Sequence, residues 1–143
     1  MAKNSQINPG AEIPETQVNQ KQMQSLAKAF WNLAHLYRLD RKEQAILLGL
    51  KEDSRNRLND LEKRQEIPVD ADKFLRIANL IGIHKNLRIL YPKNREIVYQ
   101  WMKIPRDWLN NQTPMEFIRE NPIESLPRLF SLRRKLDQIR CGQ

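Results

Sequence analysis

The segment Asp40-Arg41-Lys42-Glu43-Gln44-Ala45-Ile46-Leu47-Leu48-Gly49-Leu50 decides the fold class of this 143-residue chain. Asp40 suits the N-cap of a helix, and Glu43 stands three residues later, where its side chain can complete a capping box. Gly49 follows the apolar run and can adopt the left-handed conformation that ends a helix. We therefore predict a short capped helix that stops at a tight turn and leads into a further helix.

A helical period continues on both sides of this segment. On its N-terminal side, apolar residues recur at steps of three and four: Met23, Leu26, Ala27, Phe30, Trp31, Ala34 and Tyr37. On its C-terminal side, we predict helices over about residues 51–64, 70–82, 84–90, 92–101, 114–120 and 126–140. The residues expected to face inward are Leu58, Leu61, Phe74, Ile77, Ala78, Ile81, Ile97, Val98 and Trp101. No segment shows sustained two-residue alternation, so we predict an all-α fold.

Particular residues predict where several of these helices start and stop. Asp70 suits the N-cap of the helix over residues 70–82, and Gly82 suits its end. The strongest start signal is Thr113-Pro114-Met115-Glu116, with a capping threonine, a proline at the first helical position and a glutamate that can close a capping box. A basic amphipathic segment follows, with Leu129, Leu132, Leu136 and Ile139 at helical spacing. We interpret at least half of these four residues, and Trp101, as core rather than partner contacts.

Composition narrows the classes of partner and the location. A net charge of +8 favours a polyanionic partner, although a solvated basic surface with no such role accounts for it as well. The single cysteine, Cys141, excludes an internal disulfide framework and suits a reducing cytoplasm. The longest apolar run is far shorter than the roughly 20 residues that a membrane span requires. We expect a soluble cytoplasmic protein, with residues 1–20 as a flexible N-terminal arm.

The sequence offers no constellation typical of catalysis. His35 and His84 lie on different predicted helices, and neither has a Cys, Asp or Glu three or four residues later to form a metal pair. Four glycines leave no phosphate-binding loop, and Cys141 stands in the tail rather than beside a base in a cleft. We therefore predict that the chain is not an enzyme and binds no cofactor or metal.

The predicted helices around Gly49 have the spacing of a helix-turn-helix, in which the helix after the turn enters the major groove of DNA. The residues that we expect to contact DNA are Lys51, Arg55, Asn56 and Asn59. Against this, residues 51–64 contain five basic and four acidic residues, which is a weak phosphate clamp. A three-helix packing unit with a solvated polar face remains the alternative.

The order of several motifs from residue 30 to residue 142 resembles the Xre/MbcA/ParS antitoxins, the neutralising partners of RES-type toxins. The resemblance is carried by residues 47–50, 72–77, 81–87 and 90–92, by Trp101 and Pro105, and by residues 109–115, 132–137, 140 and 142. The chain departs from the family pattern at three sites. Arg106 replaces a frequent asparagine, Asn110-Asn111 replaces a Gly-Gly turn, and Gln143 replaces a terminal tryptophan. Because asparagine tolerates the left-handed region, we expect the turn to survive.

The resemblance implies a protein in two parts. Residues 21–91 would form a helix-turn-helix and dimerisation domain that represses the protein's own operon by binding operator DNA. Residues 92–143 would bind the cognate RES-domain toxin, and the C-terminal segment would occlude its NAD pocket. The residues expected to bind the toxin are Arg133, Arg134, Asp137, Arg140, Cys141, Gly142 and Gln143. The alternatives are a DNA-binding regulator without a toxin partner and an adaptor that has lost DNA binding.

Overall fold

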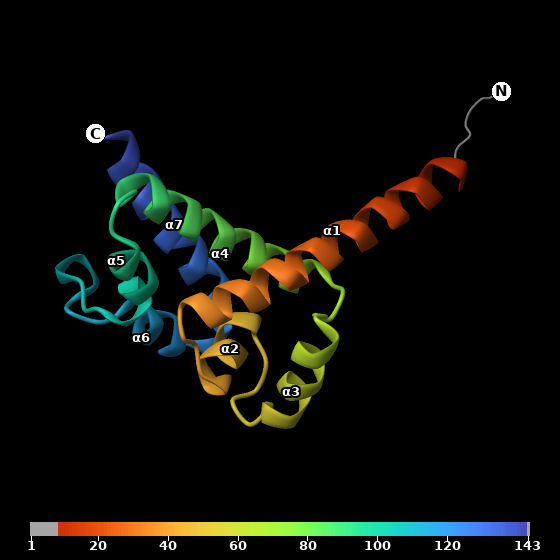
Figure 1. Cartoon of the computed structure of the whole chain (residues 1–143), viewed down its shortest axis with the longest axis horizontal. Helices are drawn as coiled ribbons and strands as arrows, with labels where there is room; N and C mark the ends of the chain where they lie inside the picture. Colours follow the sequence, from red (N-terminus) through yellow and green to blue (C-terminus); the bar gives the residue numbers. More distant parts are fainter. Residues whose placement is uncertain (1–8, 143) are drawn as a thin grey trace.

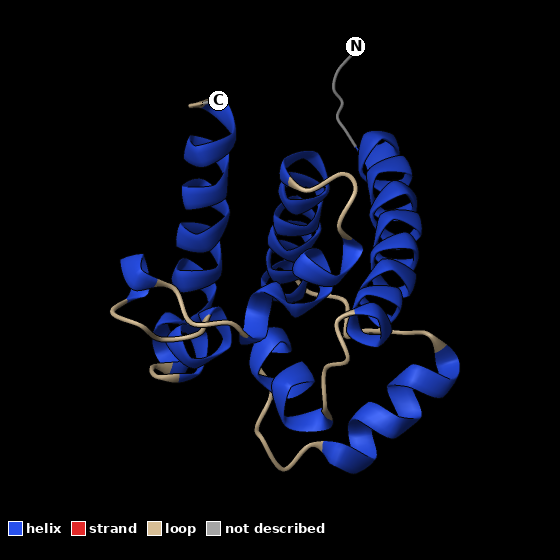
Figure 2. Cartoon of the chain, turned by 60° about the vertical axis from the view of Figure 1, so that its left-hand side comes forward, coloured by secondary structure: helices blue, strands red, loops and turns tan. Residues whose placement is uncertain are grey.

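The computed structural model describes residues 9–142, and in this range the chain is helical, with no β-strand (Figure 2). The α-helices are α1 (Pro9–Leu36), α2 (Arg41–Leu48), α3 (Arg55–Arg64), α4 (Ala71–Leu90), α5 (Arg95–Gln100), α6 (Pro114–Arg119) and α7 (Ser125–Cys141). Three short 3₁₀ turns are η1 (Trp101–Lys103), η2 (Asp107–Leu109) and η3 (Pro122–Glu124). The predicted all-α class is confirmed.

Three long helices, α1, α4 and α7, form the frame of the molecule (Figure 1). Helix α7 lies along α4 and runs parallel to it, since Ser125 contacts Arg76 near the start of α4 and Asp137 contacts Asn86 further along. Helices α2 and α3 lie below this frame in Figure 1, and α6 packs against the start of α7. None of the helices in the described range is both long enough and apolar enough to cross a membrane.

One continuous hydrophobic core connects the two expected domains. It includes Phe30 of α1, Leu48 of α2, Leu58 of α3, Ile77 of α4 and Leu129 of α7. Most residues that were expected in the core are buried or pack against it. They are the apolar stripe of α1, Leu58, Leu61, Val98 and Trp101. Leu129, Leu132 and Leu136 are also buried, whereas Ile139 is exposed, so the interpretation of this stripe as mainly core is confirmed.

The cap signals predicted from sequence are present. Asp40 and Thr113 each form a complete capping box with Glu43 and Glu116, and Pro114 occupies the first turn of α6. Gly49 ends α2 with φ at +70°. The Asn110-Asn111 turn also survives, because both asparagines adopt the left-handed conformation, with φ of 54° and 64°.

Helix α4 corrects the prediction that Gly82 ends a helix. It continues as a single 20-residue helix from Ala71 to Leu90. Because it packs against α1 as well as α7, its buried stripe runs through Ile77, Leu80, Ile83 and Leu87. The expected inward residue Phe74 lies instead on an exposed face.

Three helix starts also differ from expectation. Helix α3 begins at Arg55, because residues 51–54 form a turn closed by a hydrogen bond from Ser54 N to Lys51 O. Helix α5 begins at Arg95, because Asn94 rather than Pro92 provides the cap, and Ile97 is exposed. Helix α1 begins at Pro9, so residues 9–20 of the expected flexible arm are helical, in keeping with the good helix formers Ala, Glu and Gln in this segment. Residues 1–8 of that arm lie outside the described range.

Candidate interaction surfaces

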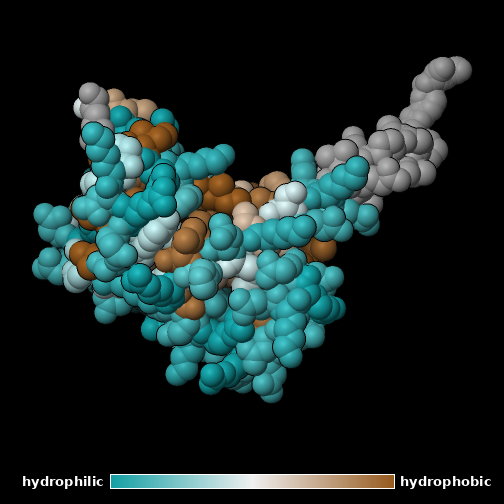
Figure 3. Space-filling view, viewed as in Figure 1, coloured by the Kyte–Doolittle hydropathy of each residue, from teal (hydrophilic) through white to brown (hydrophobic). Residues whose placement is uncertain are grey.

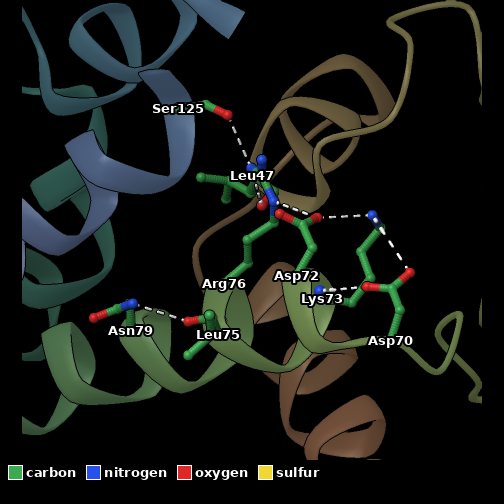
Figure 4. Close-up of polar contacts among 8 residues, drawn as sticks. All are labelled: Leu47, Asp70, Asp72, Lys73, Leu75, Arg76, Asn79 and Ser125. Atoms are coloured by element: carbon green, nitrogen blue, oxygen red, sulfur yellow. Dashed lines mark hydrogen bonds and ion pairs between the residues drawn. The ribbon is translucent and has the colours of Figure 1, made fainter. Parts of the chain in front are cut away.

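Arg76 of α4 joins three helices at a buried polar junction (Figure 4). Only 6% of this residue is exposed. Its Nε donates to Asp72 Oδ2 at 2.9 Å, and its Nη1 donates to Ser125 Oγ at 2.9 Å and to the Leu47 carbonyl at 3.4 Å. The guanidinium therefore connects the end of α2 with the start of α7, and a buried charge is tolerated because it is paired and hydrogen-bonded.

The acidic partner in this junction is shared between two cations. Asp72 Oδ2 also accepts from Lys73 Nζ at 2.9 Å, and Lys73 Nζ lies 3.9 Å from Asp70. Burial alone raises the pKa of the Asp72 carboxyl, but the hydrogen bonds from Lys73 and Arg76 outweigh burial and hold that pKa below its ordinary value. Asp72 therefore stays ionised and compensates the positive charge of Arg76.

Gly49 lies directly over this guanidinium. A Cβ atom at Gly49 would lie 2.6 Å from Arg76 Cζ and 2.8 Å from Nη2, closer than real side-chain contacts allow. Its positive φ independently favours glycine. Gly49 thus serves both the predicted turn and a close contact with α4.

Further polar contacts connect the expected domains. Lys103 Nζ donates to the Arg38 carbonyl at 2.7 Å and lies 3.4 Å from Glu43. Arg119 of α6 lies 3.8 Å from Glu52 in the turn after α2. Together with Arg76, these contacts indicate that residues 21–91 and residues 92–142 pack as one body.

The expected DNA-contacting residues do not share one environment. Arg55 and Asn56 are exposed on the first turn of α3, and Lys51 is exposed in the preceding turn. Asn59 does not point outward as expected, because its Oδ1 accepts from Arg41 Nε at 2.9 Å. Arg41 also pairs with Glu62 at 2.6 Å, so Asn59 belongs to a contact between α2 and α3. Arg57, which the sequence analysis did not select, is exposed beside Asn56.

The expected toxin-binding residues lie on α7 and just after it. Arg134, Arg140, Cys141 and Gly142 are exposed, while Gln143 lies outside the described residues. Asp137 is less available, because its Oδ1 accepts from Asn86 of α4 at 2.8 Å and lies 3.8 Å from Arg140. Arg133 is partly buried against α4, where Gly82 leaves space for its side chain.

An apolar groove lies between α1 and the start of α4, and apolar side chains gather between these helices in Figure 3. Its volume is about 420 Å³, and it is lined by Met23, Val69, Asp70, Ala71, Phe74 and Leu75. Val69 is 69% exposed and Leu75 47%. The sequence analysis missed this surface because it assigned Phe74 to the core.

The loop that carries two of the family departures packs on tryptophans. Arg106 Cζ lies 5.2 Å from the ring centre of Trp101, and its Nη2 donates to the Trp101 carbonyl at 3.1 Å. Burial lowers the pKa of Arg106, and its Nε is the one buried side-chain polar atom without a partner among the described residues. Lys135 of α7 lies over Trp108 of the same loop, at 5.5 Å. The loop is therefore held against the C-terminal helix.

One of the two histidines has a structural contact. His84 Nδ1 and the Tyr37 hydroxyl are 3.0 Å apart and connect α4 with the end of α1. Burial, followed by the nearby Arg88 charge, lowers the pKa of His84, and burial raises the pKa of Tyr37. Across the described residues, no group of three or more His, Cys, Asp and Glu side chains is placed to hold a metal ion.

Comparison with known proteins finds no matching family model, no similar curated protein and no similar solved structure.

Proposed function

We propose that this chain is the antitoxin of a type II toxin–antitoxin pair and neutralises a RES-type, NAD-consuming toxin with the end of α7. The observation that carries the proposal is the division of α7 into an anchored part and an exposed part. Leu129, Leu132 and Leu136 are buried against the body of the protein, whereas residues 138–142 are exposed and include Arg140. The exposed part is thus a preformed helix end on a fixed base.

Such a helix end is physically suited to occlude a pocket. Because it is already helical, it loses little conformational entropy on docking. Arg134 and Arg140 offer guanidinium groups for charge-assisted hydrogen bonds to carboxylates at a pocket mouth. The chain then acts by steric exclusion and needs no catalytic group of its own.

The same proposal includes repression of the operon by α2, the turn at Gly49 and α3. Lys51, Arg55 and Asn56 are exposed together at the start of α3 and are the residues that we assign to operator contacts. Asn59 is a weaker candidate, since Arg41 holds its side chain. A regulator without a toxin partner would use this surface alone.

We assign homodimerisation to the apolar groove between α1 and α4. Asp70 lines this groove, Lys21 lines a neighbouring hollow beside Phe74, and Glu66 lines a hollow between α1 and the segment before α4. A second copy related by a two-fold axis would bury the exposed apolar side chains of Val69, Phe74 and Leu75. Replacing Phe74 by glutamate should convert the dimer to a monomer, measured by light scattering on the eluted protein.

The test starts with the tagged chain purified from its native cells, with co-purified proteins identified by mass spectrometry. We expect a RES-domain protein in stoichiometric amount, which consumes NAD after separation and is inhibited when the chain is added back. Recovery of the chain with DNA alone would instead favour the regulator.

Truncation separates the two activities. Deleting residues 139–143 removes the exposed end of α7 and keeps Leu136 and the Asp137–Asn86 bond, so the protein should fold. We expect this variant to bind promoter DNA and to lose neutralisation. The paired variant Arg55→Ala/Asn56→Ala should show the opposite result. If the truncated chain still neutralises the toxin, occlusion by the tail is wrong.

A further inference from the structure

We propose that Gly82 is a positioning residue that fixes the Arg133 guanidinium in a slot on α4, where Arg133 binds a carboxylate of the toxin. The carboxylate part of this inference rests on the proposed antitoxin function. The slot itself follows from the contact between α4 and α7.

The geometry of the slot is tight. A Cβ atom at position 82 would lie 2.3 Å from Arg133 Nε, 2.5 Å from Cζ and 2.8 Å from Cδ. The arginine side chain therefore crosses α4 directly over the glycine backbone. Any other residue at position 82 would displace it. This explains why a glycine stands in the middle of a continuous helix, where it is otherwise unfavourable.

The other cations of α7 already have contacts within the chain. Arg128 donates to Glu120 at 2.9 Å, and Arg140 lies 3.8 Å from Asp137. Arg134 lies 5.9 Å from the ring centre of Phe130, and Lys135 lies 5.5 Å from that of Trp108. Among the residues that the structure describes, no hydrogen bond or ion pair engages Arg133.

No acidic side chain on the adjoining face of α4 compensates this charge. The residues one helical turn before and after Gly82 are Asn79 and Asn86, which are both amides. Asp137 is four residues after Arg133 on α7, but it accepts from Asn86 instead. Arg133 thus lies against α4 without an acidic partner among the described residues, so its donors remain available to an external carboxylate.

A fixed guanidinium is a better carboxylate ligand than a free one. Its planar donors can form two parallel hydrogen bonds, and packing against α4 has already restricted its rotamers. Lysine at position 133 would keep the charge and lose the planar geometry. Replacing Arg133 by lysine should therefore lower the affinity for the toxin even though it leaves the stability of the fold unchanged.

A double-mutant cycle tests the slot on the chain alone, because it needs only the unfolding stability of each variant. Gly82→Ala should raise the melting temperature less in the wild-type background than in the Arg133→Ala background, because in the wild type the added Cβ must displace the Arg133 side chain. In the Arg133→Ala background the same change should raise it, because the space is then free and alanine favours helix. Gly142→Ala is the control, since its Cβ would meet only the backbone oxygens of Gln138 and Ile139, at 3.3 and 3.7 Å, and no arginine. An equal change of melting temperature in both backgrounds would overturn the slot.

The carboxylate role is tested by calorimetric titration of the separated toxin with each full-length variant. Arg133→Lys should keep the wild-type melting temperature and bind the toxin about tenfold more weakly. Gly82→Ala should weaken binding only when arginine is present at position 133. Wild-type affinity for Arg133→Ala would overturn this role and leave the antitoxin function standing. Failure of the wild-type chain to bind any toxin would refute the proposed function and the carboxylate role together.

Discussion

Two arginines lie over two glycines in this molecule, and the two contacts have different consequences. At the junction of α2, α4 and α7, Gly49 lies over Arg76, whose guanidinium is bonded to Asp72 and Ser125. Along the α4–α7 contact, Gly82 lies under Arg133, for which no acidic partner is present among the described residues.

The comparison shows that close packing of an arginine on a glycine does not by itself define a role. The role depends on the acceptors within reach. Around Arg76, a carboxylate, a hydroxyl and a carbonyl use the donors, so the contact stabilises the fold. Around Arg133, the α4 residues one helical turn before and after Gly82 are the amides Asn79 and Asn86, so no carboxylate of this face compensates the charge.

The largest expected effect is the loss of the Arg76 junction. Arg76→Met should lower the free energy of unfolding by on the order of 3 kcal/mol, because Ser125 and the Leu47 carbonyl lose their donor and Asp72 loses a counter-charge. The matched variant Arg133→Met should cost less than about 1 kcal/mol, because it breaks no hydrogen bond or ion pair among the described residues. Urea denaturation measures both. Similar losses of unfolding free energy in the two variants would mean that the Arg76 and Arg133 contacts contribute equally to stability.

A smaller loss of stability is expected from replacing Gly49, the glycine of the same junction. Gly49→Ala should cost about 2 kcal/mol, since an L residue with φ at +70° is strained and its Cβ meets Arg76. Gly49→Asn tolerates the positive φ but keeps the clash, so the difference between the two variants separates strain from sterics. Thermal unfolding measures this difference. If asparagine fully restored the wild-type stability, the contact with Arg76 would carry no energy.

The smallest expected effect is the acid sensitivity of the Arg76 junction. The pKa of Asp72 lies below its ordinary value in the folded protein, so the native state binds fewer protons than the unfolded state as the pH falls. Its contribution is present above the unfolded pKa and is lost as the pH falls through the native pKa. It amounts to less than about 1 kcal/mol, because 42% of the side chain is exposed and water screens it.

Denaturation of the wild type and of Asp72→Asn between about pH 5 and about pH 2 measures this contribution. The stability of the variant should fall less steeply with acid than that of the wild type. Asp53→Asn, in the exposed turn outside the junction, serves as the control and should retain the wild-type slope. An unchanged slope in Asp72→Asn would show that the carboxyl does not couple folding to protons.

Local signals in the sequence predicted the local features well. Asp40 and Thr113 cap helices through their neighbours three residues later, so the capping boxes could be read without knowledge of the fold. The positive φ of Asn110 and Asn111 was predictable for the same reason. Three-residue and four-residue spacing likewise placed Phe30, Leu58 and Leu129 in the core.

The sequence alone was misleading where one residue type serves two physical purposes. Gly82 suited a helix end, yet only the approach of α7 shows that a continuous helix needs the space that glycine leaves. Asn59 suited a DNA contact, yet Arg41, 18 residues earlier in the chain, holds its amide. The sequence analysis gave Arg76 no structural role, because its bond with Ser125, 49 residues later in the chain, depends on where α7 packs.

The sequence by itself therefore determined the all-helical class, most caps and most of the core, because these depend on interactions within one or two helical turns. The tertiary structure decided which cations are used inside the protein and which remain available. It also decided which apolar residues form the groove between α1 and α4. Both depend on which elements lie side by side. Gly82 and Arg133 are far apart in the sequence, so no local sequence pattern predicts their contact.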